Sequence, residues 1–214
     1  MKNKIGVMQG RLLPKYKGNY QAHPLGYWKK EFKIARDIGL DNIEFILDFN
    51  EADANPLLKR DGVEEIKKVV KKTGVKVQTI CADYFMDAPL HSLDIKVAEQ
   101  SQQVMFRLID VSALLGVTDI VIPCVEKSSL NNNDALDRFI KQMQPLVRIA
   151  EKKHINLSLE TDLAPQPFLD LLSRFQSERV TINYDIGNSA SLGYNPVEEL
   201  NAYGSMISDI HIKD

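Results

Sequence analysis

Two kinds of hydrophobic pattern alternate along the whole chain. Short apolar runs, typical of buried strands, are separated by longer segments in which apolar residues recur every three or four positions, as on one face of a helix. The predicted strands lie near residues 5–9, 42–46, 75–80, 117–122, 155–160, 181–185 and 207–214. The predicted helices lie near residues 24–38, 62–73, 92–115, 134–153, after Pro165, and 195–204.

Glycine marks the end of several predicted helices. Gly39, Gly74 and Gly116 each follow a helical segment and precede a strand, where a left-handed residue commonly ends a helix. Ser92 precedes the longest helix and is predicted to be its N-cap. His154 takes the corresponding helix-stop position after 134–153, so we interpret it as structural.

Strict alternation of strands and helices predicts an α/β fold with a parallel sheet and helical crossovers. We expect a (β/α)8 TIM barrel and not a doubly wound open sheet, because polar residues end many different strands and no glycine-rich phosphate fingerprint follows the first strand. The chain is expected to form one domain, residues 1–214. Since such barrels need about 250 residues and eight strands, we expect the last helix–strand–helix portion to be absent from this chain.

Composition narrows the function classes. The 214 residues are 44% hydrophobic and 26% charged, with a net charge of −2, which argues against a nucleic-acid partner. No apolar run approaches the roughly 20 residues needed to cross a bilayer, so no membrane partner is expected. The N-terminal segment resembles a strand more than a signal peptide, and we predict a cytoplasmic protein. Cys81 and Cys124 are interpreted as reduced, buried thiols.

Three polar residues end three successive predicted strands. Glu160, Asp185 and His211 are 25 (185 − 160) and 26 (211 − 185) residues apart, which suits one strand and one helix per step. Two carboxylates and an imidazole are suitable ligands for a divalent ion such as Mn, Mg, Co or Zn. Each residue taken singly is also explained as a helix cap, a salt-bridge partner or a solvated loop residue. Three such residues at the ends of three successive strands favour a metal site.

The same segments resemble a known family. The motifs are Leu-Glu-Thr-Asp at 159–162, Tyr-Asp-Ile-Gly-Asn at 184–188 and His-Ile-Lys-Asp at 211–214. They are similar to those of the xylose-isomerase-like barrels, and most of all to pentulose-5-phosphate 3-epimerases. The resemblance implies that Glu160, Asp185 and His211 are metal ligands and that Glu160 is also one of two acid–base carboxylates. The family's fourth ligand, a glutamate after strand 8, would lie beyond Asp214.

The chemistry of such a site is proton transfer next to a ketone. A cation bridging the carbonyl oxygen and a neighbouring hydroxyl would stabilise the enediolate, and Glu160 would remove the proton. The expected function is therefore epimerisation or isomerisation of a small-molecule ketose or ketose phosphate. Returning the proton to the same carbon or to its neighbour requires the same parts, so the sequence leaves the two reactions open.

Other residues are weaker candidates for substrate binding. Glu44 ends the second strand and is predicted either to bind a substrate hydroxyl or to be a buried acid paired with a basic group. Asn188 either contacts substrate or shapes the turn. Lys213 lies two residues after His211 and is expected to point inward with it.

The loop after the first strand is basic. Arg11, with Lys15 and Lys17, is a candidate phosphate-binding residue, although a solvated charged loop explains these residues as well. His23 is interpreted as a loop residue without a partner.

Two alternatives belong to other functional classes. A type IV-like DNA-repair endonuclease shares the expected fold, but it needs more histidines than the 4 in this chain, and Asn188 stands where such enzymes carry one. A truncated, non-catalytic product would have two unpaired sheet edges, which would allow pairing between chains and thus a homo-oligomer. A lyase or dehydratase on the same scaffold also remains open.

Overall fold

Seven parallel strands form one sheet in sequence order, from β1 to β7, in the computed structural model, which describes residues 4–213. Every neighbouring pair is parallel. Because each strand lies beside its sequence neighbours, the sheet has the barrel topology and lacks the reversal of order in a doubly wound sheet. The strands are β1 (Gly6–Met8), β2 (Asn42–Ile46), β3 (Thr79–Cys81), β4 (Asp119–Cys124), β5 (Asn156–Thr161), β6 (Val180–Asp185) and β7 (Ile207–His211).

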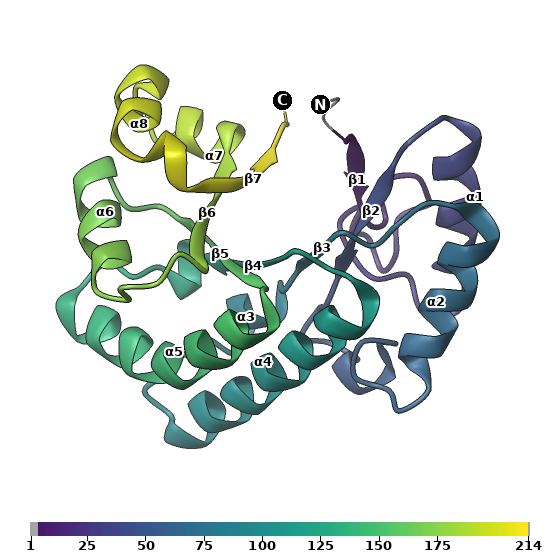
Figure 1. Ribbon diagram of the computed structural model, residues 1–214, viewed down its shortest axis with the longest axis horizontal. Helices are drawn as coiled ribbons and strands as arrows, with labels where there is room; N and C mark the ends of the chain where they lie inside the picture. Colours follow the sequence, from purple (N-terminus) through teal and green to yellow (C-terminus); the bar gives the residue numbers. More distant parts are fainter. Residues whose placement is uncertain (1–3, 214) are drawn as a thin grey trace.

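The helices cover the outside of a curled sheet. Figure 1 shows β1 and β7 on the two sides of an opening, with the helices around the outside of the curve. The fold is thus the predicted barrel type, with seven strands in the described residues. The helices are α1 (Lys29–Asp37), α2 (Gly62–Thr73), α3 (Tyr84–Asp87), α4 (Ile95–Leu115), α5 (Asn133–Lys153), α6 (Pro165–Ser173), α7 (Ile186–Ser191) and α8 (Pro196–Tyr203), with short 3-10 turns at Ala52–Ala54, Glu126–Ser128 and Gly204–Met206.

The observed helix limits correct several predictions. The first helix begins at Lys29 and not near Pro24, because 25–28 forms turns. Asp94, not Ser92, caps α4: its carboxylate accepts a hydrogen bond from the Lys96 amide at 2.9 Å. The short helices α3 and α7 were not predicted.

The predicted helix stops are confirmed. Gly39, Gly74 and Gly116 have φ values of 81°, 79° and 75°. His154 ends α5 with φ of 57°, a left-handed conformation that is uncommon for a residue with a side chain. Its structural assignment is therefore confirmed.

Alternate residues of the strands face two different layers. Leu157 and Leu159 of β5 belong to the large apolar layer between sheet and helices. Apolar packing on the inner face is much smaller, a cluster of Ile46, Cys81 and Val121 with Met8 beside it. The rest of the inner face is polar, which leaves space and donors for a site.

A bulge interrupts the pairing of β6 with β7. Ile182 pairs with Ile207, but Asn183 pairs with Asp209, so one residue of β7 is unmatched. Beyond the bulge, Asp185 lies opposite His211. The bulge therefore sets which side chain of β7 meets Asp185.

Cys81 and Cys124 are buried free thiols, as expected. Burial raises the pKa of both, so both stay protonated. Among the helices of residues 4–213, none combines the length and apolarity that crossing a bilayer requires.

Candidate active site

The three predicted ligands come together at the carboxyl ends of adjacent strands. Glu160 lies on β5, Asp185 ends β6 and His211 ends β7, and one ligand atom from each lies within 4.8 Å of the other two. His211 Nδ1 is 3.6 Å from Glu160 Oε2 and 3.7 Å from Asp185 Oδ2. The sequence prediction of a converging triad agrees with this geometry.

Glu160 is a buried carboxylate held by two amides. Asn183 donates to Oε2 at 2.8 Å, and the side-chain amide of Asn188 donates to Oε1. Burial raises the pKa of Glu160 to about 7, with Asp185 adding to the rise and His211 opposing it. A carboxyl group with a pKa near neutrality can both accept and return a proton at physiological pH.

Asp185 has two structural contacts besides its place in the triad. Its Oδ1 accepts from the Asn188 backbone amide at 2.8 Å and so caps α7, while Oδ2 is 2.7 Å from Lys213 Nζ. Burial alone would raise the pKa of Asp185, but contacts with His211 and Lys213 lower it to about 2. Gly187 permits this approach, since a Cβ there would lie 2.6 Å from Lys213 Cγ.

Glu44 reaches the triad from β2, on the other side of the opening. Its Oε1 is 2.9 Å from His211 Nε2, and Thr79 donates to its Oε2 at 2.6 Å. Burial would lower the pKa of His211, but Asp185 and Glu44 raise it to about 11. Glu44 is thus a buried acid paired with a basic group, one of the two expectations; its contact with substrate remains a prediction.

The donor set fits a divalent cation. Two carboxylates and one imidazole nitrogen converge, and Glu44 at Nε2 leaves Nδ1 facing Glu160 and Asp185. A carboxylate that accepts from the other ring nitrogen is the usual partner of a metal-binding histidine. The carboxylates of Asp185 and Glu44 beside the ring raise the pKa of His211, so this position favours positive charge.

The other predicted binding residues separate into two groups. Asn188 and Lys213 contact the triad directly. The guanidinium of Arg11 contacts Gln21 Oε1 at 3.4 Å, and no described contact joins Arg11 to the triad. Lys15 lies over the Tyr20 ring and Lys17 pairs with Glu51.

His23 differs from its prediction. It is 3% exposed, and its Nδ1 lies 3.0 Å from Gln9 Oε1, so it is a buried residue with a partner. Its ring packs against Trp28 and Phe45 of the outer layer. Burial lowers its pKa to about 3, so the ring is neutral.

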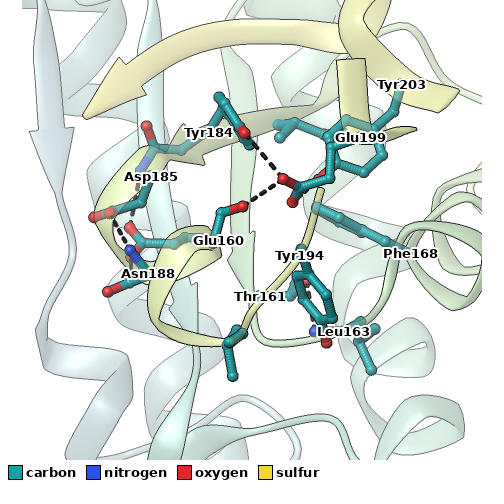
Figure 2. Close-up of a pocket in the computed structure, with 14 residues that line it drawn as sticks. Glu160, Thr161, Leu163, Phe168, Tyr184, Asp185, Asn188, Tyr194, Glu199 and Tyr203 are labelled. Atoms are coloured by element: carbon teal, nitrogen blue, oxygen red, sulfur yellow. Dashed lines mark hydrogen bonds between the residues drawn. The ribbon is translucent and has the colours of Figure 1, made fainter. Parts of the chain in front are cut away.

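Sequence reasoning did not identify Asn183. It is 2% exposed, donates to Glu160 and lies 3.0 Å from His211 Nδ1 through the same nitrogen. The available signal was its position, because it lies two residues before Asp185 and therefore on the same face of β6. Figure 2 shows the adjoining pocket, where Glu160, Asp185 and Asn188 lie at one end and Glu199 and Tyr203 at the other.

Known proteins are similar to this chain in sequence. L-ribulose-5-phosphate 3-epimerase UlaE of Salmonella paratyphi A is 26% identical over 207 residues, covering 91% of this chain and 71% of that protein. UlaE of Escherichia coli O1:K1 is 24% identical over 204 residues, covering 91% and 71%.

Solved structures resemble the fold at lower identity. A xylose isomerase-like TIM barrel protein from Mycobacterium smegmatis, in complex with magnesium, has a TM-score of 0.73 and 21% identity, covering 99% of this chain and 74% of that one. The E. coli 3-keto-D-glucoside 4-epimerase YcjR has a TM-score of 0.70 and 17% identity, covering 87% and 73%. The profile of the xylose isomerase-like TIM barrel matches residues 32–214, and the chain therefore belongs to that family.

Proposed function

We propose that this protein is a divalent-metal-dependent epimerase or isomerase of a ketose or ketose phosphate. The observation that carries the proposal is the triad of Glu160, Asp185 and His211, in which a carboxyl group with a pKa of about 7 lies beside two further ligand atoms. Sequence similarity to L-ribulose-5-phosphate 3-epimerases supports a ketose phosphate as the substrate class.

Glu160 is the proposed acid–base group. It takes the proton from the carbon next to the substrate carbonyl, and its raised pKa allows it to hold that proton at neutral pH. A cation bound by Glu160, Asp185 and His211 would stabilise the negative charge that develops on the substrate oxygens.

The surrounding residues orient this group. Asn183 and Asn188 hold the two oxygens of Glu160, and Glu44 fixes the His211 ring. Asn188 and Glu44 have further acceptor or donor capacity, and we propose that they also contact substrate hydroxyls. Lys213, whose side chain is 43% exposed, is the proposed contact for a substrate oxygen or phosphate. Arg11 remains a candidate for a distant phosphate group.

Two substrate classes are supported by relatives. The UlaE relatives act on a sugar phosphate by name, whereas a D-allulose 3-epimerase from Methylomonas, solved with D-allulose, has a TM-score of 0.69 and 16% identity, covering 87% of this chain and 66% of that one. The proposal therefore includes free and phosphorylated ketoses, and both belong in the test.

The test is hydrogen exchange with solvent. The protein is incubated with ketoses and their phosphates in deuterated water, with Mn²⁺ or with chelator, and label at the carbon next to the carbonyl is measured by NMR. We expect label that requires metal, is lost in Glu160→Gln and is retained in Glu151→Gln, a matched change at an exposed position of α5. Labelling that persists in Glu160→Gln would contradict the assigned base. Metal-dependent cleavage of an abasic duplex, without labelling, would favour the endonuclease alternative.

A further inference from the structure

The turn that joins β6 to α7 carries site residues on one side and buried hydroxyls on the other. Asp185 and Asn188 contact the triad or belong to it. Their immediate neighbours, Tyr184 before and Ser189 after, are bonded to Glu199 on α8. Figure 2 shows this separation, with Asp185 and Asn188 away from Glu199 and Tyr184 joined to it.

Glu199 is a buried carboxylate whose contacts are all with hydroxyl groups. It is 2% exposed and accepts hydrogen bonds from Tyr184 Oη at 3.0 Å, from Ser189 Oγ, and from Tyr203 Oη at 2.7 Å. Within residues 4–213, none of the ion pairs involves it. Burying a carboxylate is costly unless it is well bonded, and these three donors offset that cost.

The turn needs this support because its own sequence is weakly helical. Helix α7 is six residues long and contains one glycine, one asparagine and two serines. These residues have low helix propensity, and so short a helix is not stable by itself. The carboxylate of Asp185 caps the first turn of α7 by accepting from the Asn188 amide. This cap cannot fix the turn alone, because it requires Asp185 to be held in place already.

We propose that Glu199 is a positioning residue. It holds the β6–α7 turn from the side opposite the triad and so fixes Asp185 and Asn188 in the positions that metal binding requires. The metal part of this inference rests on the proposed function, whereas the holding of the turn does not. Within residues 4–213 the Glu199 side chain makes no hydrogen bond or ion pair with the triad, so it would act through Tyr184 and Ser189.

The network contains its own control. Tyr203 bonds to Glu199 from the same helix, four residues further on, and within residues 4–213 its hydroxyl makes no hydrogen bond to the β6–α7 turn. Its ring packs against that of Tyr184, with centroids 6.3 Å apart, and phenylalanine keeps this contact. Tyr203→Phe removes one buried hydroxyl donor to Glu199, as do Tyr184→Phe and Ser189→Ala, but it leaves both links to the turn. A merely structural role of the network predicts the same behaviour for all three variants.

The experiment measures two properties of the three single variants and the wild type. The first is hydrogen–deuterium exchange of the backbone amides of 186–191, with chelator present. The second is Mn²⁺ affinity by calorimetry. Tyr184→Phe and Ser189→Ala should exchange these amides faster and bind Mn²⁺ about 10-fold more weakly, as is usual when support of a metal ligand is lost. Tyr203→Phe should remain within about twofold of wild type in both.

Each outcome decides a different point. Equal exchange at 186–191 in all three variants would overturn the inference, whatever the metal result. Faster exchange in Tyr184→Phe and Ser189→Ala with unchanged Mn²⁺ affinity would overturn its link to the site. Failure of the wild type to bind Mn²⁺ would refute the metal centre of the proposed function, and the exchange data would still decide whether Glu199 holds the turn.

Discussion

The outer face of the sheet is apolar and the inner face is mostly polar, although alternate residues of the same strands form the two faces. In β5, Leu157 and Leu159 pack under the helices, while Ser158 and Glu160 face the inside with polar partners. Strands of parallel sheets covered on both faces are usually apolar throughout. Alternation in such a strand therefore indicates that one face serves another purpose than packing.

The inner face is stabilised by hydrogen bonds between its own polar groups. Asp119 accepts from Ser158 at 2.9 Å, and the Ser158 hydroxyl lies 2.9 Å from that of Thr181 and 2.8 Å from that of Ser208. Buried polar groups that are paired in this way cost little, whereas an unpaired group costs about 1–3 kcal/mol. The outer face depends on apolar area and shape. Mutations on the outer face should therefore lower stability, whereas mutations of the triad on the inner face should lower activity.

The largest expected effect is on activity, at the inner face. Glu160→Gln keeps the volume of the side chain but removes the proton acceptor, so kcat should fall about 10²–10⁴-fold. The thermal unfolding temperature should fall only modestly. Burial already disfavours the charged carboxylate, but one of the two oxygens that accept from Asn183 and Asn188 becomes an amide donor. Steady-state kinetics and a thermal melt on the same preparation check this, and a variant that keeps more than a tenth of the activity would remove Glu160 from the mechanism.

The residue that precedes Glu160 in β5 should show the opposite behaviour. Leu159 is fully buried in the outer layer, so Leu159→Ala should lower the free energy of unfolding by about 2–5 kcal/mol. Urea denaturation measures the loss. Leu114→Ala serves as control, since Leu114 is 59% exposed and its loss should cost less than about 0.5 kcal/mol. Equal losses for the two leucines would show that the outer layer is not the main apolar core.

Two buried histidines should give stability curves of opposite slope in chelator. His211 has a pKa raised from 6.5 to about 11, so its contribution is full below pH 6.5 and is lost as pH rises toward 11. His23 has a pKa lowered from 6.5 to about 3, so its contribution is full above pH 6.5 and is lost as pH falls toward 3. Each changes the free energy of unfolding by about 1.4 kcal/mol per pH unit within its window.

The measurement for the histidines is urea unfolding across pH, comparing wild type with His211→Gln and with His23→Gln. The difference curves should slope in opposite directions, in the windows above and below pH 6.5. Parallel difference curves would mean that the two faces do not impose different charges.

The smallest expected effect concerns the inner hydrogen-bond network. Ser158→Ala removes one hydroxyl from between Asp119 and Thr181, and should lower the free energy of unfolding by about 1 kcal/mol. Ser173, whose hydroxyl bonds at the surface to the Asp170 carbonyl, provides the matched control, with an expected change below about 0.5 kcal/mol. A Ser158→Ala protein as stable as the control would show that the network is not needed for folding.

The sequence predicted features that depend on local pattern. Strand ends at Glu160, Asp185 and His211, and the left-handed stop at His154, follow from residue type and spacing, and the structure agrees. Helix α7 was not predictable in this way, because its residues favour a turn and tertiary contacts with Glu199 stabilise the helix instead.

Long-range pairings were also beyond the sequence. Glu44 and His211 are 167 residues apart, and their contact depends on how far the sheet curls, which no local pattern states. The partner of His23 depends likewise on Gln9 turning its side chain toward that ring.

The bulge in β7 makes one short segment serve both faces. In a regular strand Ile207, Asp209 and His211 would share a face, because they are two residues apart. Here Ile207 packs against the outer apolar layer, whereas His211 meets Asp185 on the inner face. One unmatched residue thus changes which side chains of β7 face inward. The start of β7 packs against the apolar layer, and its end presents a metal ligand to the inner face. Without the bulge, the pairing that starts at Ile182 and Ile207 would place Ile210 opposite Asp185. The chemistry of the site therefore depends on a register as much as on a residue.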